Sequence, residues 1–145
     1  MFMEIELSKK SVVFDATIIE LPKVFAEQGN ITAVNNNQEI PFEIKRVYYL
    51  YDVPGGVARG GHAHKQLKQL IIAASGSFDI IIDDGKVKRT FNLSRPDYAL
   101  FLPSGLWREL DNFSSGAICL VLASLEYTET DYIRNYKDFI KFKTT

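Results

Sequence analysis

The chain has 145 residues, a formal net charge of −1 and hydrophobic side chains at 46% of its positions. This length predicts a single domain over residues 1–145, and the near-neutral charge gives no general attraction to nucleic acid or to a membrane surface. Any anionic ligand must therefore be held by locally placed cations. The chain opens with no basic-then-apolar leader, and no apolar run approaches the roughly 20 residues of a membrane span, so we expect a cytoplasmic protein.

Short apolar runs separated by turn residues predict a mainly β protein, either a sandwich or a barrel. The only cysteine, Cys119, lies in one of these runs and is expected to be a small core side chain. Asp84-Gly85 between two runs is a strong signal for a tight hairpin. The predicted strands, in chain order, are 18–24, 31–34, 42–51, 69–74, 77–83, 86–93, 98–102, 106–112 and 117–123.

The last segment of the chain has a different pattern. Thr128 followed by Asp131 resembles a capping box, and apolar residues then recur at helical spacing. These features predict an amphipathic C-terminal helix over about 129–142 that packs on the barrel.

Both histidines of the chain lie in the run Arg59-Gly60-Gly61-His62-Ala63-His64-Lys65. On a strand, residues two positions apart point to the same face, so the two imidazole rings are expected to share one space. Imidazole titrates near neutrality and serves as a proton shuttle or as a metal ligand. The residues farther along the chain distinguish these two functions.

The spacing around the histidines resembles the two signature motifs of the cupin superfamily, G(x)5HxH(x)4E(x)6G and PxG(x)2H(x)3N. The resemblance implies an all-β fold, an RmlC-like jelly-roll barrel, with the C-terminal amphipathic helix packed against it. Two positions depart from the metal-binding pattern, because Gln69 replaces a glutamate ligand and Arg108 replaces a histidine ligand. Gln is a poor metal ligand and Arg repels a cation. We therefore expect no metal and no cofactor. The matching residues are Gly56, His62, His64, Gly76, Pro103, Gly105 and Asn112.

Longer runs of the chain, among them residues 40–49, residues 59–65 and the quartet 131–134, carry a closer resemblance. They are similar to the dTDP-sugar 3,4-ketoisomerases, which are metal-free cupins of bacterial deoxysugar pathways. The similarity extends from about residue 41 to residue 142, and it implies conversion of dTDP-4-keto-6-deoxyglucose into a 3-keto sugar that is later aminated. Gln28 departs from the pattern, since many relatives have an arginine before the glycine at this place. The segments that carry the resemblance are residues 40–49, 59–65, 83–85, 113–115, 122–124 and the quartet Asp131-Tyr132-Ile133-Arg134.

The residues suit this chemistry independently of the family. Moving a ketone from C4 to C3 requires a proton to leave C3 and another to arrive at C4 through an enediol, and neutral imidazoles such as His62 and His64 can carry them. Arg46 and Arg108 are candidates to stabilise the enediolate. By resemblance, Tyr48 joins one histidine in a relay between O3 and O4. Aromatic strand packing is the alternative for Tyr48.

The nucleotide part of the substrate needs separate contacts. Arg59, at a glycine-flanked turn, is expected to bind the diphosphate, and Lys65 is a second candidate cation unless it is simply solvated. Trp107 is a candidate to stack on the sugar or the thymine, with core packing as the alternative.

Two other functions and one assembly remain open from the sequence. The chain could be a metal-dependent cupin enzyme, or a barrel that binds a nucleotide sugar without catalysis. The resemblance implies a homodimer that exchanges its N-terminal strands, over about residues 1–35, and the isolated apolar runs there fit such an exchange.

Overall fold

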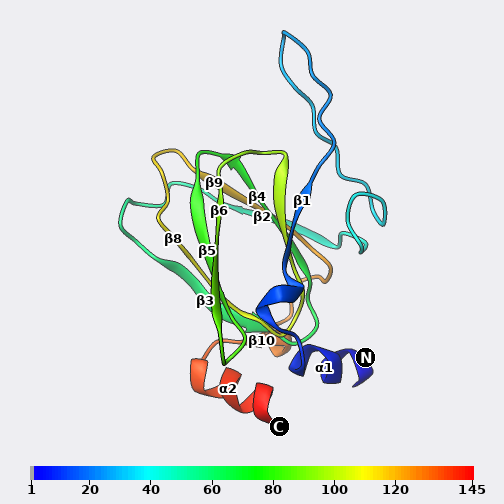
Figure 1. The fold of residues 1–145 in the computed structure, drawn as a ribbon, viewed down its shortest axis with the longest axis vertical. Coiled ribbons are helices and arrows are strands. Elements are labelled where there is room, and N and C mark those ends of the chain that lie inside the picture. The colour runs from blue at the N-terminus through cyan, green and yellow to red at the C-terminus, as the bar shows by residue number, and fades with distance from the viewer. Residues whose placement is uncertain (1) are drawn as a thin grey trace.

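The computed structural model describes residues 2–145, and it has two five-stranded antiparallel sheets packed face to face (Figure 1). The all-β prediction is confirmed. In the first sheet the strand order is β1 (Thr17–Glu20), β7 (Tyr98–Leu102), β4 (Gln69–Ser75), β9 (Ile118–Ala123) and β2 (Arg46–Leu50). In the second sheet it is β10 (Tyr132–Ile133), β3 (Arg59–His64), β8 (Trp107–Asp111), β5 (Phe78–Asp83) and β6 (Lys88–Leu93).

The predicted hairpin at Asp84-Gly85 is present between β5 and β6, whose register runs from Phe78 opposite Leu93 to Asp83 opposite Lys88. Gly85 has φ +92°, a left-handed value that glycine adopts without strain. Its N–H donates to Asp83 Oδ1 at 2.7 Å, which closes the turn.

Every second side chain along a strand points to the same face, and the faces between the two sheets form the main core. On β4, Ile71 and Ala73 face the space between the sheets, whereas Leu70 and Ile72 pack in a second cluster on the outer face. A strand with both faces covered has a continuous apolar sequence, which explains the run at 69–74. A third cluster, Ala63, Trp107, Ile133 and Phe139, lies on the outer face of the second sheet and includes the C-terminal helix.

The N-terminal region differs from the prediction of strands at 18–24 and 31–34. It begins with helix α1 (Phe2–Lys9) and a short 3-10 turn η1 (Val13–Asp15), and only β1 joins a sheet. Pro22 has no N–H for a ladder hydrogen bond, so β1 ends before it. The following segment projects beyond the sheets as an arm, residues 21–34, that has one isolated bridge between Val24 and Ile31 (Figure 1).

The C-terminal helix is present, but its predicted start at residue 129 is wrong. Helix α2 spans Tyr136–Thr144, and the Asn135 side chain caps it by accepting from the N–H groups of Lys137 and Asp138. The residues before it form a 3-10 turn η2 (Glu129–Asp131) and then β10, which pairs with the end of β3. The Thr128 side chain makes no cap hydrogen bond.

Both helices lie at the same end of the barrel (Figure 1). There the Lys143 side chain connects them to the loop between β7 and β8. Lys143 Nζ donates to the carbonyl oxygens of Ser8, Ser11 and Gly105 at 3.0, 2.7 and 2.8 Å. The Gly105 N–H in turn donates to the His64 carbonyl at 2.7 Å. This chain of contacts ties both termini to the strand that carries the histidines.

The described residues, 2–145, include no helix that is both long and apolar enough to cross a membrane.

Candidate active site

His62 and His64 lie on β3 and face the space between the two sheets, as their spacing predicts. Their ring centroids are 4.8 Å apart with an interplanar angle of 89°, and the residues are 8% and 3% exposed. The register between β3 and β8 shifts between Arg59 and His62, which marks a bulge in which Gly60 has φ +80°. The bulge brings His62 directly opposite Arg108.

Arg108 and Tyr48 link the two sheets across the interior. Arg108, on β8, is 2% exposed and donates from Nη2 to the Tyr48 hydroxyl on β2 at 3.0 Å. Arg46 precedes Tyr48 by two residues and shares its face, and the Arg46 guanidinium carbon lies 4.7 Å from the Tyr48 ring centroid. The predicted shared face of Arg46 and Tyr48 is therefore present.

A second hydrogen bond joins the open edges of the two sheets. Arg46 Nη2 on edge strand β2 donates to the Tyr132 hydroxyl on edge strand β10 at 3.1 Å. The Tyr132 ring also packs on both histidines, with centroid distances of 5.2 Å to His62 and 4.4 Å to His64. Tyr132 is a member of the site that the sequence analysis did not single out.

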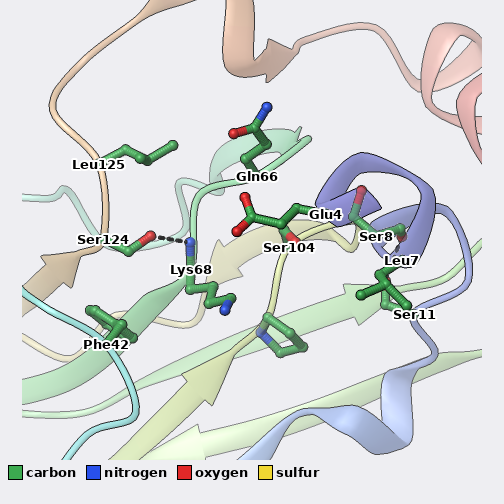
Figure 2. Close-up of a pocket in the computed structure, with 11 residues that line it drawn as sticks. Glu4, Leu7, Ser8, Ser11, Phe42, Gln66, Lys68, Ser104, Ser124 and Leu125 are labelled. Atoms are coloured by element: carbon green, nitrogen blue, oxygen red, sulfur yellow. Dashed lines mark hydrogen bonds between the residues drawn. The ribbon is translucent and has the colours of Figure 1, made fainter. Parts of the chain in front are cut away.

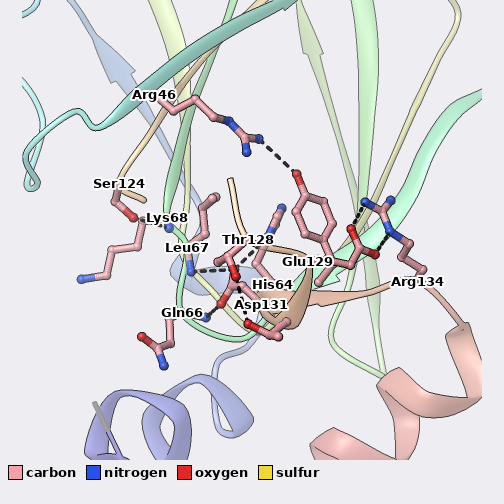
Figure 3. Close-up of polar contacts among 12 residues, drawn as sticks. Arg46, His64, Gln66, Leu67, Lys68, Ser124, Thr128, Glu129, Asp131 and Arg134 are labelled. Atoms are coloured by element: carbon pink, nitrogen blue, oxygen red, sulfur yellow. Dashed lines mark hydrogen bonds and ion pairs between the residues drawn. The ribbon is translucent and has the colours of Figure 1, made fainter. Parts of the chain in front are cut away.

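Asp131 is the second residue that the sequence analysis missed. Its Oδ2 lies 3.0 Å from His64 Nδ1, and its two oxygens also accept the backbone N–H groups of Gln66 at 2.8 Å and Leu67 at 3.3 Å (Figure 3). The local pattern assigned Asp131 to a helix cap, and the only signal for another function was its place in the quartet 131–134 of the family resemblance.

Both imidazoles are neutral in this environment. Burial, followed by the positive charges of Arg108 and of a protonated His64, lowers the pKa of His62 to about 2. Burial also lowers the pKa of His64, although the hydrogen bond to Asp131 acts in the opposite direction. The burial of Asp131 works to raise its own pKa, but the hydrogen bonds from His64 and the Gln66 N–H keep that pKa below its usual value. A neutral imidazole can accept a proton at one nitrogen and donate from the other.

Several buried polar atoms of this cluster have no hydrogen-bond partner within residues 2–145. Buried polar groups without partners are costly, and their grouping marks a place where a polar ligand can supply the missing contacts. The guanidinium groups supply donors and positive charge, which suits oxygen atoms of an anionic ligand or intermediate. The atoms are Nε2 of His62 and of His64, Nε and Nη1 of Arg46 and of Arg108, and Oε1 of Gln69.

Known proteins are similar to this chain in sequence and fold over most of their length. A protein-family model described as FdtA: WxcM-like, C-terminal matches residues 14–144. A TDP-4-oxo-6-deoxy-alpha-D-glucose-3,4-oxoisomerase of Aneurinibacillus thermoaerophilus is 42% identical over 86% of this chain and 90% of its own length. The chain belongs to this family of sugar 3,4-ketoisomerases.

Two solved structures agree with this assignment. The TDP-quinovose 3,4-ketoisomerase WlaRB of Campylobacter jejuni is 46% identical, with a TM-score of 0.85 over 89% of this chain and 99% of that one. The ketoisomerase QdtA of Thermoanaerobacterium thermosaccharolyticum, solved with TDP, is 35% identical, with a TM-score of 0.89 over 92% of this chain and 97% of that one. The predicted family and the cupin-type barrel are therefore confirmed.

In this 3,4-ketoisomerase, Trp107 lies on the outer face of the second sheet. Neighbouring strand residues point to opposite faces, so Trp107 faces α2 while Arg108 faces the interior. The Trp107 ring lies 5.3 Å from the Tyr136 ring and 5.8 Å from the Phe139 ring, measured between centroids, and the residue is 7% exposed. These contacts fit the core-packing alternative for Trp107, and its stacking on a substrate stays a prediction.

The two remaining cations lie outside the buried cluster. Arg59 is exposed at the start of β3, opposite Leu110. Lys65 directly follows β3 and lines a shallow pocket with Tyr132, Arg134 and other residues. Neither side chain forms a hydrogen bond within residues 2–145.

The ligand set of a metal cupin is not assembled around the histidines of this ketoisomerase. Gln69, 1% exposed, occupies the position of the glutamate ligand, and the Arg108 guanidinium lies opposite His62. Within residues 2–145, no group of three or more His, Cys, Asp or Glu side chains is arranged to hold an ion.

A separate pocket lies between α1 and the barrel (Figure 2). Gln66 and Lys68 from the loop after β3 line it together with Ser124, whose hydroxyl accepts the Lys68 N–H at 2.8 Å. None of the predicted site residues lines this pocket.

Proposed function

We propose that the chain converts TDP-4-oxo-6-deoxyglucose into a TDP-3-oxo-6-deoxyhexose. The observation that carries the proposal is the convergence of unpartnered nitrogen atoms of His62, His64, Arg46 and Arg108 in one buried space. The 42% identical relative is named for the 3,4-oxoisomerase reaction on this sugar nucleotide, which supports the choice of substrate.

The reaction is a transfer of two hydrogens within the sugar and needs no oxidant or reductant. A neutral imidazole removes the proton from C3, and the electron pair of the C–H bond forms a C3–C4 double bond while O4 gains a proton. The enediol then loses its O3 proton, the C3 carbonyl forms, and C4 receives a proton from an imidazolium. The products of the transfer are a C3 ketone and a C4 hydroxyl.

Tyr48 is the proposed proton carrier between O3 and O4. Its hydroxyl oxygen accepts a hydrogen bond from Arg108 Nη2, so the hydroxyl hydrogen itself remains free to be donated to a sugar oxygen. Arg108 also supplies a fixed positive charge for the negative oxygen that develops in the enediolate, with Arg46 as a second source. Removing a preorganised donor of this kind costs about 100-fold to 1000-fold in rate.

The nucleotide is proposed to extend out of the barrel toward Arg59 and Lys65. A diphosphate is bound well by a guanidinium fork, and the exposed Arg59 can present one. The relative QdtA was solved with TDP, which supports a nucleotide diphosphate as the common ligand.

The test of this function is proton NMR of TDP-4-oxo-6-deoxyglucose incubated with the protein in D2O. We expect a 3-oxo product with deuterium at C4 and, through the reverse reaction, deuterium at C3 of the remaining 4-oxo substrate. The variants His62→Asn and His64→Asn should lose turnover while they still bind TDP with an affinity close to that of the wild type. If no 3-oxo product forms and no deuterium enters the sugar, the proposal is wrong and a barrel that only binds the nucleotide sugar becomes the better description.

A metal-dependent cupin is the alternative enzyme, and the same preparation tests it. Stoichiometric metal in the purified protein, together with loss of turnover on chelation, would favour that alternative. With Arg108 opposite His62, we expect turnover to be unchanged by a chelator.

The proposed active form is a homodimer in which the arm, residues 21–34, reaches a second copy. Phe25 and Ile31 on the arm are 74% and 65% exposed, and a groove lined by Val47, Ile72 and Leu122 lies on the outer face of the first sheet. Clustered exposed apolar side chains favour an interface. Phe25→Asp should shift the protein toward a monomer in light scattering after gel filtration, whereas Val87→Asp, at the distant β5–β6 hairpin, should not. Equal masses for both variants would exclude a role of the arm.

A further inference from the structure

We infer that Asp131 is a positioning residue that keeps the proton of neutral His64 on Nδ1 and thereby presents the Nε2 lone pair to the substrate. The catalytic part of this inference rests on the function proposed above. The part that concerns the position of the proton stands on the geometry alone.

The hydrogen-bond partners of Asp131 leave one assignment of protons. Its Oδ1 accepts the Gln66 N–H at 2.8 Å, and its Oδ2 accepts the Leu67 N–H at 3.3 Å and faces His64 Nδ1 at 3.0 Å. Backbone N–H groups only donate, so both carboxylate oxygens act as acceptors here. A carboxylate in this position requires His64 Nδ1 to carry the hydrogen, as in other carboxylate–histidine pairs.

The Asp131 carboxylate is also fixed in place. Asp131 is 6% exposed, its backbone N–H donates to the Thr128 carbonyl at 3.2 Å, and its own carbonyl accepts the Lys65 N–H at 3.0 Å. Three donors on its side chain and two backbone contacts leave it no freedom to rotate away from His64. The imidazole plane is therefore set by the turn η2 and by the loop that follows β3.

The contact between Asp131 and His64 makes the two histidines differ in how well each can hold a positive charge. Once Nε2 of His64 accepts a proton, the imidazolium is stabilised by the adjacent negative charge of Asp131. The other charged and titratable groups that face His64 are His62 on its own strand, Arg108 on β8, Arg46 on β2 and the Tyr132 hydroxyl on β10.

Within the described residues, 2–145, His62 has no carboxylate neighbour of this kind. The charged groups around His62 are Arg108, Arg134 and Arg46, all cations, together with His64. We therefore assign to His64 the role of holding a proton, as an imidazolium, between the two transfer steps.

Nitrogen-15 NMR of the imidazole rings tests the position of the proton directly. The chain has only two histidines, so His62→Gln identifies the His64 signals without further assignment. In the wild type we expect long-range proton–nitrogen correlations of a protonated Nδ1 and an unprotonated Nε2. In Asp131→Asn we expect the amide oxygen at the place of Oδ1, because the hydrogen bond from the Gln66 N–H, at 2.8 Å, is shorter than the one from the Leu67 N–H, at 3.3 Å. The amide group then donates toward His64 Nδ1, and the hydrogen moves to Nε2.

Turnover and binding separate a positioning role from a purely structural one. Asp131→Asn should lower kcat by at least about 100-fold, the usual range of a lost acid–base contribution, while the dissociation constant for TDP changes less than about twofold. Asp131→Glu should restore the Nδ1 hydrogen and part of the rate. The matched control is Asp138→Asn, an exposed carboxylate on α2, which should leave tautomer and rate unchanged.

Three results would overturn the inference. A wild-type His64 with its hydrogen on Nε2 would do so even if Asp131→Asn failed to fold. An Asp131→Asn variant that keeps the Nδ1 hydrogen, or that keeps the wild-type kcat after the hydrogen has moved, would do the same. If the wild type does not turn over the sugar but shows the Nδ1 hydrogen, the proposed function fails while the assignment of the proton holds.

Discussion

Replacement of Arg108 by methionine is expected to stabilise the free protein while it removes turnover. Arg108 is 2% exposed, and within residues 2–145 no carboxylate forms an ion pair with it. Its Nε and Nη1 have no partner, and only Nη2 makes a hydrogen bond, to Tyr48. A fixed positive charge is thus buried without a counter-ion.

The expected magnitude follows from two opposing contributions. Burying an ion without a counter-ion costs several kcal/mol even after relaxation, whereas the lost hydrogen bond from a charged donor contributed about 1.5–3 kcal/mol. Methionine keeps the length of the side chain and adds apolar contacts. We expect the free energy of unfolding to rise by about 2 kcal/mol, which corresponds to a Tm increase of roughly 4–8 °C for a chain of this size.

Thermal and urea unfolding without nucleotide measure this effect, and the NMR assay measures turnover, which should fall by at least about 100-fold. Arg59→Met is the control for stability, because Arg59 is exposed and its loss should change the unfolding free energy by less than about 0.5 kcal/mol. If Arg108→Met melts below Arg59→Met, the guanidinium is compensated in the free protein and the argument from an unpaired buried charge is wrong.

Three further changes have defined outcomes. Tyr48→Phe should lower kcat by about 100-fold or more with little change in KM, measured by NMR, because only the proton carrier is lost; an unchanged kcat would remove Tyr48 from the relay. The pKa of His62 falls to about 2 on folding, so the unfolded chain binds a proton first as the pH falls, and acid lowers the free energy of unfolding. Between pH 6.5 and about pH 5, urea unfolding should show that the wild type loses about 1.4 kcal/mol more per pH unit than His62→Gln, which lacks this group. Equal pH slopes would contradict the buried neutral histidine. Lys143→Met should lower the unfolding free energy by about 2–4 kcal/mol, since the carbonyls of Ser8, Ser11 and Gly105 lose their donor, whereas the exposed Lys141→Met should not.

Local patterns predicted the strands of the barrel well, because the apolar run and the turn residues that indicate each strand lie within its own segment. The run at 69–74 and the Asp84-Gly85 hairpin needed no information from elsewhere in the chain. The predicted start of the C-terminal helix was wrong, because the structure there depends on a contact with a distant part of the chain. Thr128 and Asp131 have the local spacing of a capping box, yet the Asp131 carboxylate bonds to His64, 67 residues away along the chain. A tertiary contact of that separation leaves no periodic signal.

The inward direction of Arg108 depends on register, which the motif spacing alone does not determine. A slip of one residue between β3 and β8 would turn Arg108 outward and Trp107 inward. Trp107 opposes this slip, because its ring packs with Tyr136 and Phe139 on the outer face. A Cβ at Gly61 would lie 3.2 Å from the Trp107 ring, so the glycine pair at 60–61 both bends the strand and makes room for that ring. Trp107 thus serves the site from the opposite face of the strand, by holding the register that places Arg108 beside His62.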